Sequence, residues 1–139
     1  MPDTAPPGSS TPVVAVLGTG TMGAAMASNI ARSGLALRVW NRNRDVAAPL
    51  ADLGATVSDS AADASRGADV VLTVLANESV VAEVIDQARA GLGDGAVWVQ
   101  SCTVSPDGNH RLAGRANELG VAFVEAPLIG TRNRRWPVL

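Results

Sequence analysis

The chain has 139 residues, of which 47% are hydrophobic, and a formal net charge of −2 at pH 7. The length predicts one compact domain, and the composition predicts a packed core rather than a disordered chain. The low net charge gives no case for nucleic acid or an anionic membrane surface as the main partner. One cysteine excludes an internal disulfide bond, and with one histidine it leaves no ligand set for a metal such as zinc.

Residues 1–12, MPDTAPPGSSTP, contain four prolines and small polar residues, with no basic or apolar segment. Because such a composition buries too little apolar surface to become ordered, we expect a flexible N-terminal extension rather than a secretory signal. No apolar run approaches the roughly 20 residues of a membrane-spanning helix. A cytoplasmic protein is therefore the expectation.

Strand and helix patterns alternate along the first half of the remaining chain. Residues 13–17 form a continuous apolar run, which is typical of a strand buried on both faces. The helix expected next places Met22, Met26 and Ile30 on one face and ends at Gly34. A strand at 35–40, a helix at 44–53 in which Pro49 fits poorly, and a short strand at 55–57 follow.

The second half continues with a helix at 61–65, a strand at 70–75, an amphipathic helix at 78–90, a strand at 96–99, a helix at 106–119 and a strand at 121–124. This alternation predicts an α/β fold of the Rossmann type, a doubly wound and mostly parallel sheet covered by helices on both faces. Right-handed crossovers bring the carboxyl ends of the first and fourth strands together at a crevice, where such folds bind ligands.

Gly18, Gly20 and Gly23 form the pattern G-x-G-x-x-G between the first strand and the first helix. The first glycine permits a tight turn, the second lets a pyrophosphate approach the backbone, and the third lets the helix pack against the strand. Unpaired N–H groups and the partial positive charge of the helix N-terminus favour a phosphate group there. The pattern predicts a dinucleotide site, and the alternative is a purely structural turn.

The segment VWNRNRD at the end of the second strand bears on which dinucleotide binds. A carboxylate there would accept hydrogen bonds from the adenosine ribose and select NAD. Asn41 takes the acidic place here, and Arg42, Asn43 and Arg44 follow. Because a guanidinium pairs well with a phosphate dianion and asparagine can donate to it, we predict NADP(H), with NAD less favoured and Arg42 as the main anchor. The alternative is that two surface arginines simply begin a helix.

Four collinear segments resemble the β-hydroxyacid dehydrogenases, the group that includes 3-hydroxyisobutyrate dehydrogenase, tartronate semialdehyde reductase and, more distantly, the imine reductases. The segments are VLGTGTMGAAMASNIARSGLALRVWNR, GATVSDSAADASRGADVVLTVLANESVVAEVI, GAVWVQSCTVSP and GVAFVEAPLIGT. The resemblance implies an NAD(P)-binding Rossmann domain over residues 13–131. It also implies hydride transfer between NADP(H) and a small-molecule substrate, either a β-hydroxyacid or an imine.

The resemblance assigns the cofactor contacts to Gly18, Thr19, Gly20, Thr21, Met22, Gly23, Asn41, Arg42, Asn43, Leu75, Ala76 and Thr103. It assigns the substrate contacts to Cys102, Thr103 and Gly130. The segment SCTVSP matches the family's D-x-S-T-x-x-P loop, but Gln100 takes the aspartate place and Cys102 the serine place. Because a thiol is a weaker donor than a hydroxyl, this loop departs from the family's way of binding a substrate carboxylate. We interpret Cys102 as a pocket-lining residue rather than a nucleophile, and His110 as a solvated helix residue.

The sequence departs from the family after Thr131. Residues 132–139, RNRRWPVL, resemble neither the family's next strands nor its long helix into an all-helical second domain. The family's general acid–base is a lysine at the start of that domain, whereas all 11 basic residues here are arginine, so no catalytic residue is assigned. A frameshift or premature stop is the expected explanation, with the region that forms the family's homodimer missing. The alternative is a non-catalytic dinucleotide-binding module.

Overall fold

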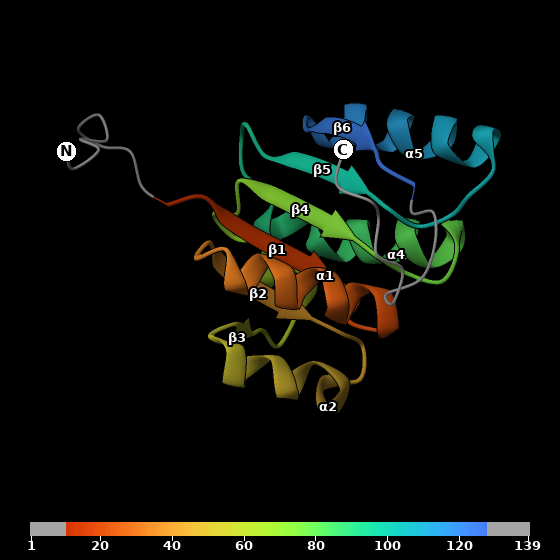
Figure 1. Ribbon diagram of the computed structural model, residues 1–139. Coiled ribbons are helices and arrows are strands. Elements are labelled where there is room, and N and C mark those ends of the chain that lie inside the picture. The colour runs from red at the N-terminus through yellow and green to blue at the C-terminus, as the bar shows by residue number, and fades with distance from the viewer. Residues whose placement is uncertain (1–10, 128–139) are drawn as a thin grey trace, which may run out of the picture.

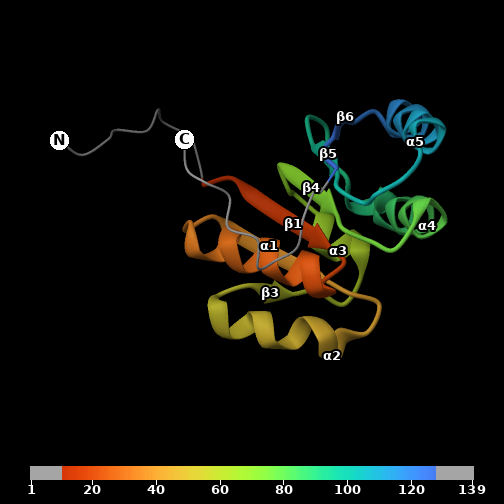
Figure 2. The same cartoon turned by 45° about the vertical axis from the view of Figure 1, so that its right-hand side comes forward.

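Six parallel strands form the centre of the molecule in the order β3-β2-β1-β4-β5-β6 (Figure 1). The structure is a computed structural model that describes residues 11–127. The strands are β1 (Val13–Leu17), β2 (Ala36–Trp40), β3 (Thr56–Val57), β4 (Val70–Thr73), β5 (Val97–Gln100) and β6 (Ala122–Glu125). The sheet grows from β1 in one direction and from β4 in the other, and this pair lies at its centre (Figure 2).

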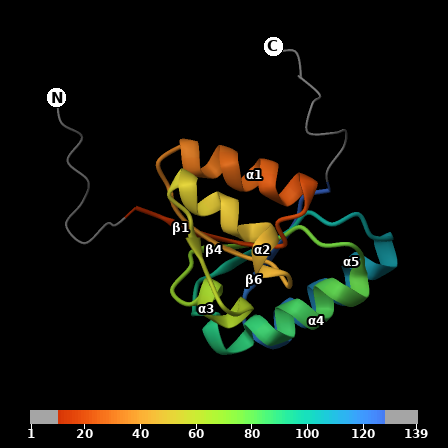
Figure 3. The same ribbon diagram turned by 90° about the horizontal axis from the view of Figure 1, so that it is seen from below.

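Helices cover both faces of the sheet, as Figure 3 shows from below. One face carries α1 (Thr21–Arg32), α2 (Arg44–Ala47) and the 3-10 helix η1 (Ala48–Leu53). The other face carries α3 (Ala61–Ser65), α4 (Glu78–Ala88), the 3-10 helix η2 (Arg89–Gly91) and α5 (Pro106–Leu119). The predicted doubly wound Rossmann-type fold is confirmed.

The apolar run of β1 supplies both hydrophobic cores. Val14 and Val16 pack with α1 and η1, whereas Ala15 and Leu17 pack with α3, α4 and α5. Successive side chains of a strand point to opposite faces, so a strand covered on both sides must be apolar at every position. All four side chains are buried, which explains why this strand shows no alternation of polar and apolar residues.

Several predicted strands shift by one residue in the structure, and three predicted elements differ by more. The helix predicted over 78–90 ends at Ala88 and continues as η2. The single helix expected over 44–53 is wrong, because α2 ends at Ala47 and η1 continues to Leu53. Pro49 has no N–H to donate to the carbonyl four residues earlier, so the chain tightens into a 3-10 helix. The strand predicted over 70–75 ends at Thr73, because its neighbour β1 ends at Leu17, whose carbonyl accepts the last bond, from the Val74 N–H (3.0 Å).

Two ion pairs join α4 to α5 on the surface. Arg111 donates to both carboxylate oxygens of Glu78 (2.6 and 2.8 Å), and Arg115 donates to both oxygens of Asp86 (2.7 and 2.6 Å). The two arginines are four residues apart, so they lie on one face of α5. The hydrogen bonds from Arg111 hold the pKa of Glu78 below its ordinary value.

This lowered pKa predicts a pH-dependent contribution to stability. A carboxylate with a lowered folded pKa stabilises the fold above its unfolded value, about 4.3, and loses that contribution as the pH falls through the folded value. We therefore expect Arg111→Ala to lower the urea midpoint at pH 7 and to differ less from the wild type below about pH 4. Arg89→Ala is the control, since Arg89 makes no ion pair within residues 11–127. A difference that stays constant into acid would contradict this prediction.

Candidate functional site

A cavity of about 510 Å³ opens at the carboxyl ends of β1, β2, β4 and β5. Open α/β sheets bind ligands where the strand order reverses, and here that point lies between β1 and β4. The cavity is lined by Gly18, Gly20, Thr21, Met22, Gly23, Asn41, Val74, Leu75, Ala76, Ser101, Cys102 and Thr103.

The fold itself requires two of the three glycines in the turn. Gly18 has a φ of +105°, and a Cβ there would lie 2.2 Å from the carbonyl oxygen of Val74. A Cβ on Gly23 would lie 1.9 Å from the carbonyl oxygen of Gly18. The third glycine of the motif is therefore needed chiefly because α1 packs against the turn itself, rather than only against the strand.

Gly20 is different. Its φ of −65° and ψ of −165° suit any residue. In the described part of the chain, no atom other than those of Gly20 and its two chain neighbours lies within 4 Å of a Cβ placed there. The fold therefore leaves space open above the N-terminus of α1, and nothing in the backbone explains why a glycine stands at this position.

The N-terminus of α1 also lacks the capping that the other helices have. The side chains of Asn43, Ser60, Asn77 and Ser105 each accept a backbone N–H at the start of α2, α3, α4 and α5. Gly20 occupies the N-cap position of α1, but it has no side chain that could accept an N–H. Among the α-helices of residues 11–127, α1 is therefore the one without a side-chain cap. The first residues of α1, Thr21, Met22 and Gly23, line the cavity, and their N–H groups have no side-chain acceptor from the N-cap residue.

Asn41 links the glycine turn to the loop after β2. Its Oδ1 accepts the N–H of Thr19 (3.0 Å), and its Nδ2 donates to the carbonyl of Asn43 (3.0 Å). The Oδ1 of Asn43 accepts the N–H of Asp45 (3.1 Å) and caps α2. Asn41 lines the cavity, whereas Asn43 and the buried Thr19 side chain lie outside its lining.

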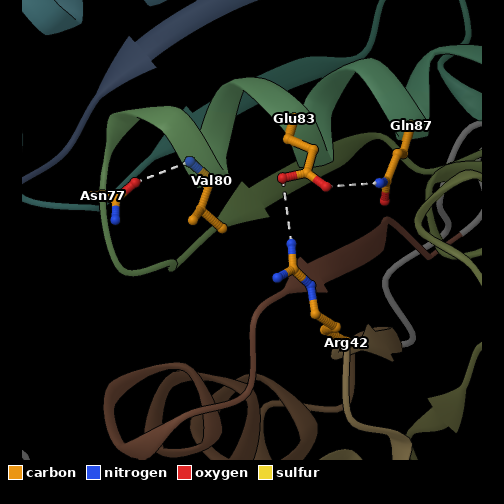
Figure 4. A network of polar contacts seen from close by, with 5 residues as sticks. All are labelled: Arg42, Asn77, Val80, Glu83 and Gln87. Carbon is orange, nitrogen blue, oxygen red and sulfur yellow. Dashed lines mark hydrogen bonds and ion pairs between the residues drawn. The ribbon is translucent and has the colours of Figure 1, made fainter.

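Arg42 reaches from the loop after β2 toward α4, as Figure 4 shows. One of its guanidinium nitrogens lies 3.4 Å from a carboxylate oxygen of Glu83, and the Arg42 side chain is 68% exposed. Gln87 also donates to Glu83 (3.4 Å). Arg42 does not line the cavity in this arrangement. An exposed ion pair of this kind stabilises a protein by about 1 kcal/mol or less, so the guanidinium can exchange Glu83 for another anion at little cost.

The loop after β5 forms the opposite end of the cavity. Ser101, Cys102 and Thr103 line it, and Cys102 is a buried free thiol. Burial raises the pKa of the Cys102 thiol above its ordinary value. Because the protonated thiol is a poor nucleophile, Cys102 fits the interpretation of a pocket-lining residue. His110 is exposed on α5.

The structure brings most of the predicted site residues together. Thr19, Arg42 and Asn43 lie outside the cavity lining, and Gly130 lies outside the described residues. Val74 and Ser101 line the cavity without having been predicted. Val74 directly precedes the predicted Leu75 after β4, and Ser101 directly precedes the predicted Cys102 after β5. Their positions just after the carboxyl ends of strands could therefore have predicted both residues.

Within residues 11–127, no group of three His, Cys, Asp or Glu side chains is arranged to hold a metal ion. No helix in the same range is long and apolar enough to span a membrane.

Residues 13–135 match the family model described as the NAD binding domain of 6-phosphogluconate dehydrogenase. The chain belongs to this family of NAD-binding domains. Its resemblance to the β-hydroxyacid dehydrogenases is also confirmed. The domain is 28% identical to the solved 3-hydroxyisobutyrate dehydrogenase of Mycobacterium tuberculosis with L-serine, with a TM-score of 0.84 over 88% of this chain and 42% of that chain.

Two further relatives of this NAD-binding domain carry different coenzymes in their names. The imine reductase from Myxococcus stipitatus in complex with NADP⁺ is 27% identical, with a TM-score of 0.82 over 88% of this chain and 43% of that one. The NAD-dependent L-serine dehydrogenase of Pseudomonas aeruginosa is 32% identical over 120 residues, which are 84% of this chain and 40% of the relative. The chain thus spans less than half the length of these relatives.

Proposed function

We propose that this NAD-binding domain binds NADP(H) across the crevice, with the pyrophosphate above the N-terminus of α1. We further propose that it serves an oxidoreductase that transfers a hydride between the nicotinamide and a small β-hydroxyacid or imine. The observation that carries the proposal is the open space at Gly20, together with the uncapped first turn of α1. An anion at this position accepts the unpaired N–H groups and interacts favourably with the helix dipole.

The two ends of the cavity suit the two halves of a dinucleotide. Asn41 marks the end near β2, where Rossmann-type folds hold the adenosine ribose. Leu75, Ala76 and Thr103 lie at the β4–β5 end, which leaves that end for the nicotinamide half. Bound there, the coenzyme supplies or accepts the hydride, and the surrounding residues orient it and exclude water.

The preference for NADP(H) over NAD(H) rests on Arg42. No carboxylate stands at the end of β2 to accept from the ribose hydroxyls, and Arg42 follows Asn41 directly. Its single 3.4 Å pairing with Glu83 leaves most of the guanidinium exposed. A 2′-phosphate carries more charge than one carboxylate and accepts from a guanidinium in a bidentate way, so it competes well for Arg42.

A paired substitution tests this preference. Arg42→Ala should weaken NADPH binding about tenfold and leave NADH binding nearly unchanged, because only NADPH carries the phosphate. Glu83→Gln should tighten NADPH binding about threefold, because it removes the competing carboxylate (Figure 4). Isothermal titration calorimetry with both coenzymes measures both effects, and Arg66→Ala is the control for the loss of an exposed arginine. Equal wild-type affinity for NADPH and NADH would contradict the preference.

A second candidate function is dinucleotide binding without turnover. Among residues 11–127, those that line the cavity include no carboxylate, imidazole or lysine, and the sequence contains no lysine at all. These residues therefore provide no general acid–base for the substrate oxygen or nitrogen. Mixing the NADPH-bound chain with hydroxyacid, aldehyde and imine substrates separates the candidates: tight binding without a change at 340 nm favours the binding module.

A further inference from the structure

Gln100 is the last residue of β5, directly before the cavity-lining Ser101, and it is 1% exposed. Its Oε1 accepts from the N–H of Cys102 (2.7 Å) and from the hydroxyl of Thr73 (3.3 Å). Its Nε2 donates to the carbonyl of Cys102 (2.9 Å) and to Oδ1 of Asn109 (3.2 Å). Both donors and both acceptor positions of this amide are thus occupied.

Two of these bonds hold the same residue from both sides. Gln100 binds the N–H and the carbonyl of Cys102, so it fixes the backbone of the loop in which Ser101, Cys102 and Thr103 line the cavity. Among side chains, only an amide offers two donor hydrogens together with an oxygen that accepts twice. A carboxylate, which the family pattern has at this position, would leave the Cys102 carbonyl and Asn109 without a donor.

The side chain of Gln100, which holds Cys102, is itself linked by hydrogen bonds to three other elements, β4, α5 and, through Asn109, β6. Thr73 of β4 accepts the indole N–H of Trp98 (2.9 Å) and donates to Gln100. Asn109 of α5 donates to Glu125 of β6 while it accepts from Gln100. A buried network in which the members satisfy one another is rigid, so the loop has little freedom to adopt another backbone conformation.

We propose that Gln100 is a positioning residue, which holds the 101–103 loop in the conformation that receives the nicotinamide half of the coenzyme. This inference rests on the proposed function, in which the dinucleotide crosses the cavity from Asn41 to Thr103. It goes further because it distinguishes the two halves of the coenzyme. Gln100 is expected to affect the nicotinamide half alone, because in the proposed arrangement the adenosine half would bind near Asn41, after β2.

The test compares NADP⁺ with 2′,5′-ADP, which contains the adenosine half and the 2′-phosphate but no nicotinamide. Gln100→Met keeps the length of the side chain and removes its hydrogen bonds. We expect it to weaken NADP⁺ binding about tenfold and to change 2′,5′-ADP binding less than about twofold. Gln100→Glu places a carboxylate oxygen against the carbonyl oxygen of Cys102 and Oδ1 of Asn109. It should weaken NADP⁺ binding at least as much as Gln100→Met does. Asn117→Asp, on the exposed face of α5, is the control for an amide-to-acid change.

Each outcome of the titrations decides the inference. A selective loss of NADP⁺ affinity supports it, whereas equal weakening of both ligands assigns Gln100 to the fold alone and overturns it. Unchanged NADP⁺ affinity also overturns it. If Gln100→Met does not fold, Asn109→Ala removes the anchor on α5 together with its bond to Glu125, leaves both bonds between Gln100 and Cys102, and should show the same selectivity at about threefold. If the wild-type chain binds neither ligand, the proposed function fails and the inference with it.

Discussion

Gly20→Asp is expected to abolish coenzyme binding while the domain remains folded. Aspartate is among the best residues at a helix N-cap, the backbone at Gly20 has ordinary angles, and a Cβ there meets no atom within 4 Å in the described residues. The stability of the fold should therefore stay the same or rise slightly. The new carboxylate would accept the N–H groups of α1 and repel the pyrophosphate, so we expect affinity for NADPH and NADH to fall about a hundredfold or more.

Calorimetric titration with both coenzymes and urea unfolding together measure this separation of binding from stability. Gly114→Asp is the matched control, because Gly114 is exposed on α5 and a Cβ there also meets nothing within 4 Å. It makes the same change in net charge away from the cavity and should bind like the wild type. Coenzyme affinity that survives in Gly20→Asp would refute the phosphate site.

Gly23→Ala is expected to have the opposite effect, a loss of stability. The new methyl group would lie 1.9 Å from the carbonyl oxygen of Gly18, and neither group can move without shifting α1 or the turn. We expect the free energy of unfolding to fall by about 3 kcal/mol or more.

Gly114→Ala serves as the control for Gly23→Ala, since it adds a methyl group to a helix at an open position. It should stabilise the domain by about 0.5–1 kcal/mol. Urea unfolding followed by circular dichroism measures both values. If Gly23→Ala unfolds with the wild-type free energy, α1 does not pack on the turn as the structure shows.

The local pattern of the chain was enough to predict the layers of the fold and the glycine turn, whereas most of the other cavity-lining residues were predicted from the family resemblance. Most strands are short and largely apolar segments, and each helix begins or ends near a residue with a defined backbone preference. In a parallel sheet the carboxyl ends of the strands meet at one edge, so the ends of β1 and β4 could be placed together before any contact was known. Cys102 and Thr103, after β5, were assigned to the site by the resemblance. The boundary at Ala47 was missed because one proline changed the hydrogen-bonding of a helix that is otherwise regular in pattern.

Contacts between distant segments decided the roles of individual residues. Gly18, Gly20 and Gly23 are equal members of one motif, yet only the folded chain shows that two of them are needed. The carbonyl of Val74, 56 residues from Gly18, leaves no space for a side chain at Gly18, whereas the space at Gly20 is open. Glu83 meets Arg42 only because α4 returns beside the end of β2. The sequence shows only that Gln100 replaces the aspartate of the family pattern. The structure shows that Gln100 is hydrogen-bonded to Thr73 of β4 and Asn109 of α5. Periodicity reports which face of an element is buried, whereas the partner of a polar atom depends on how the chain crosses over between strands.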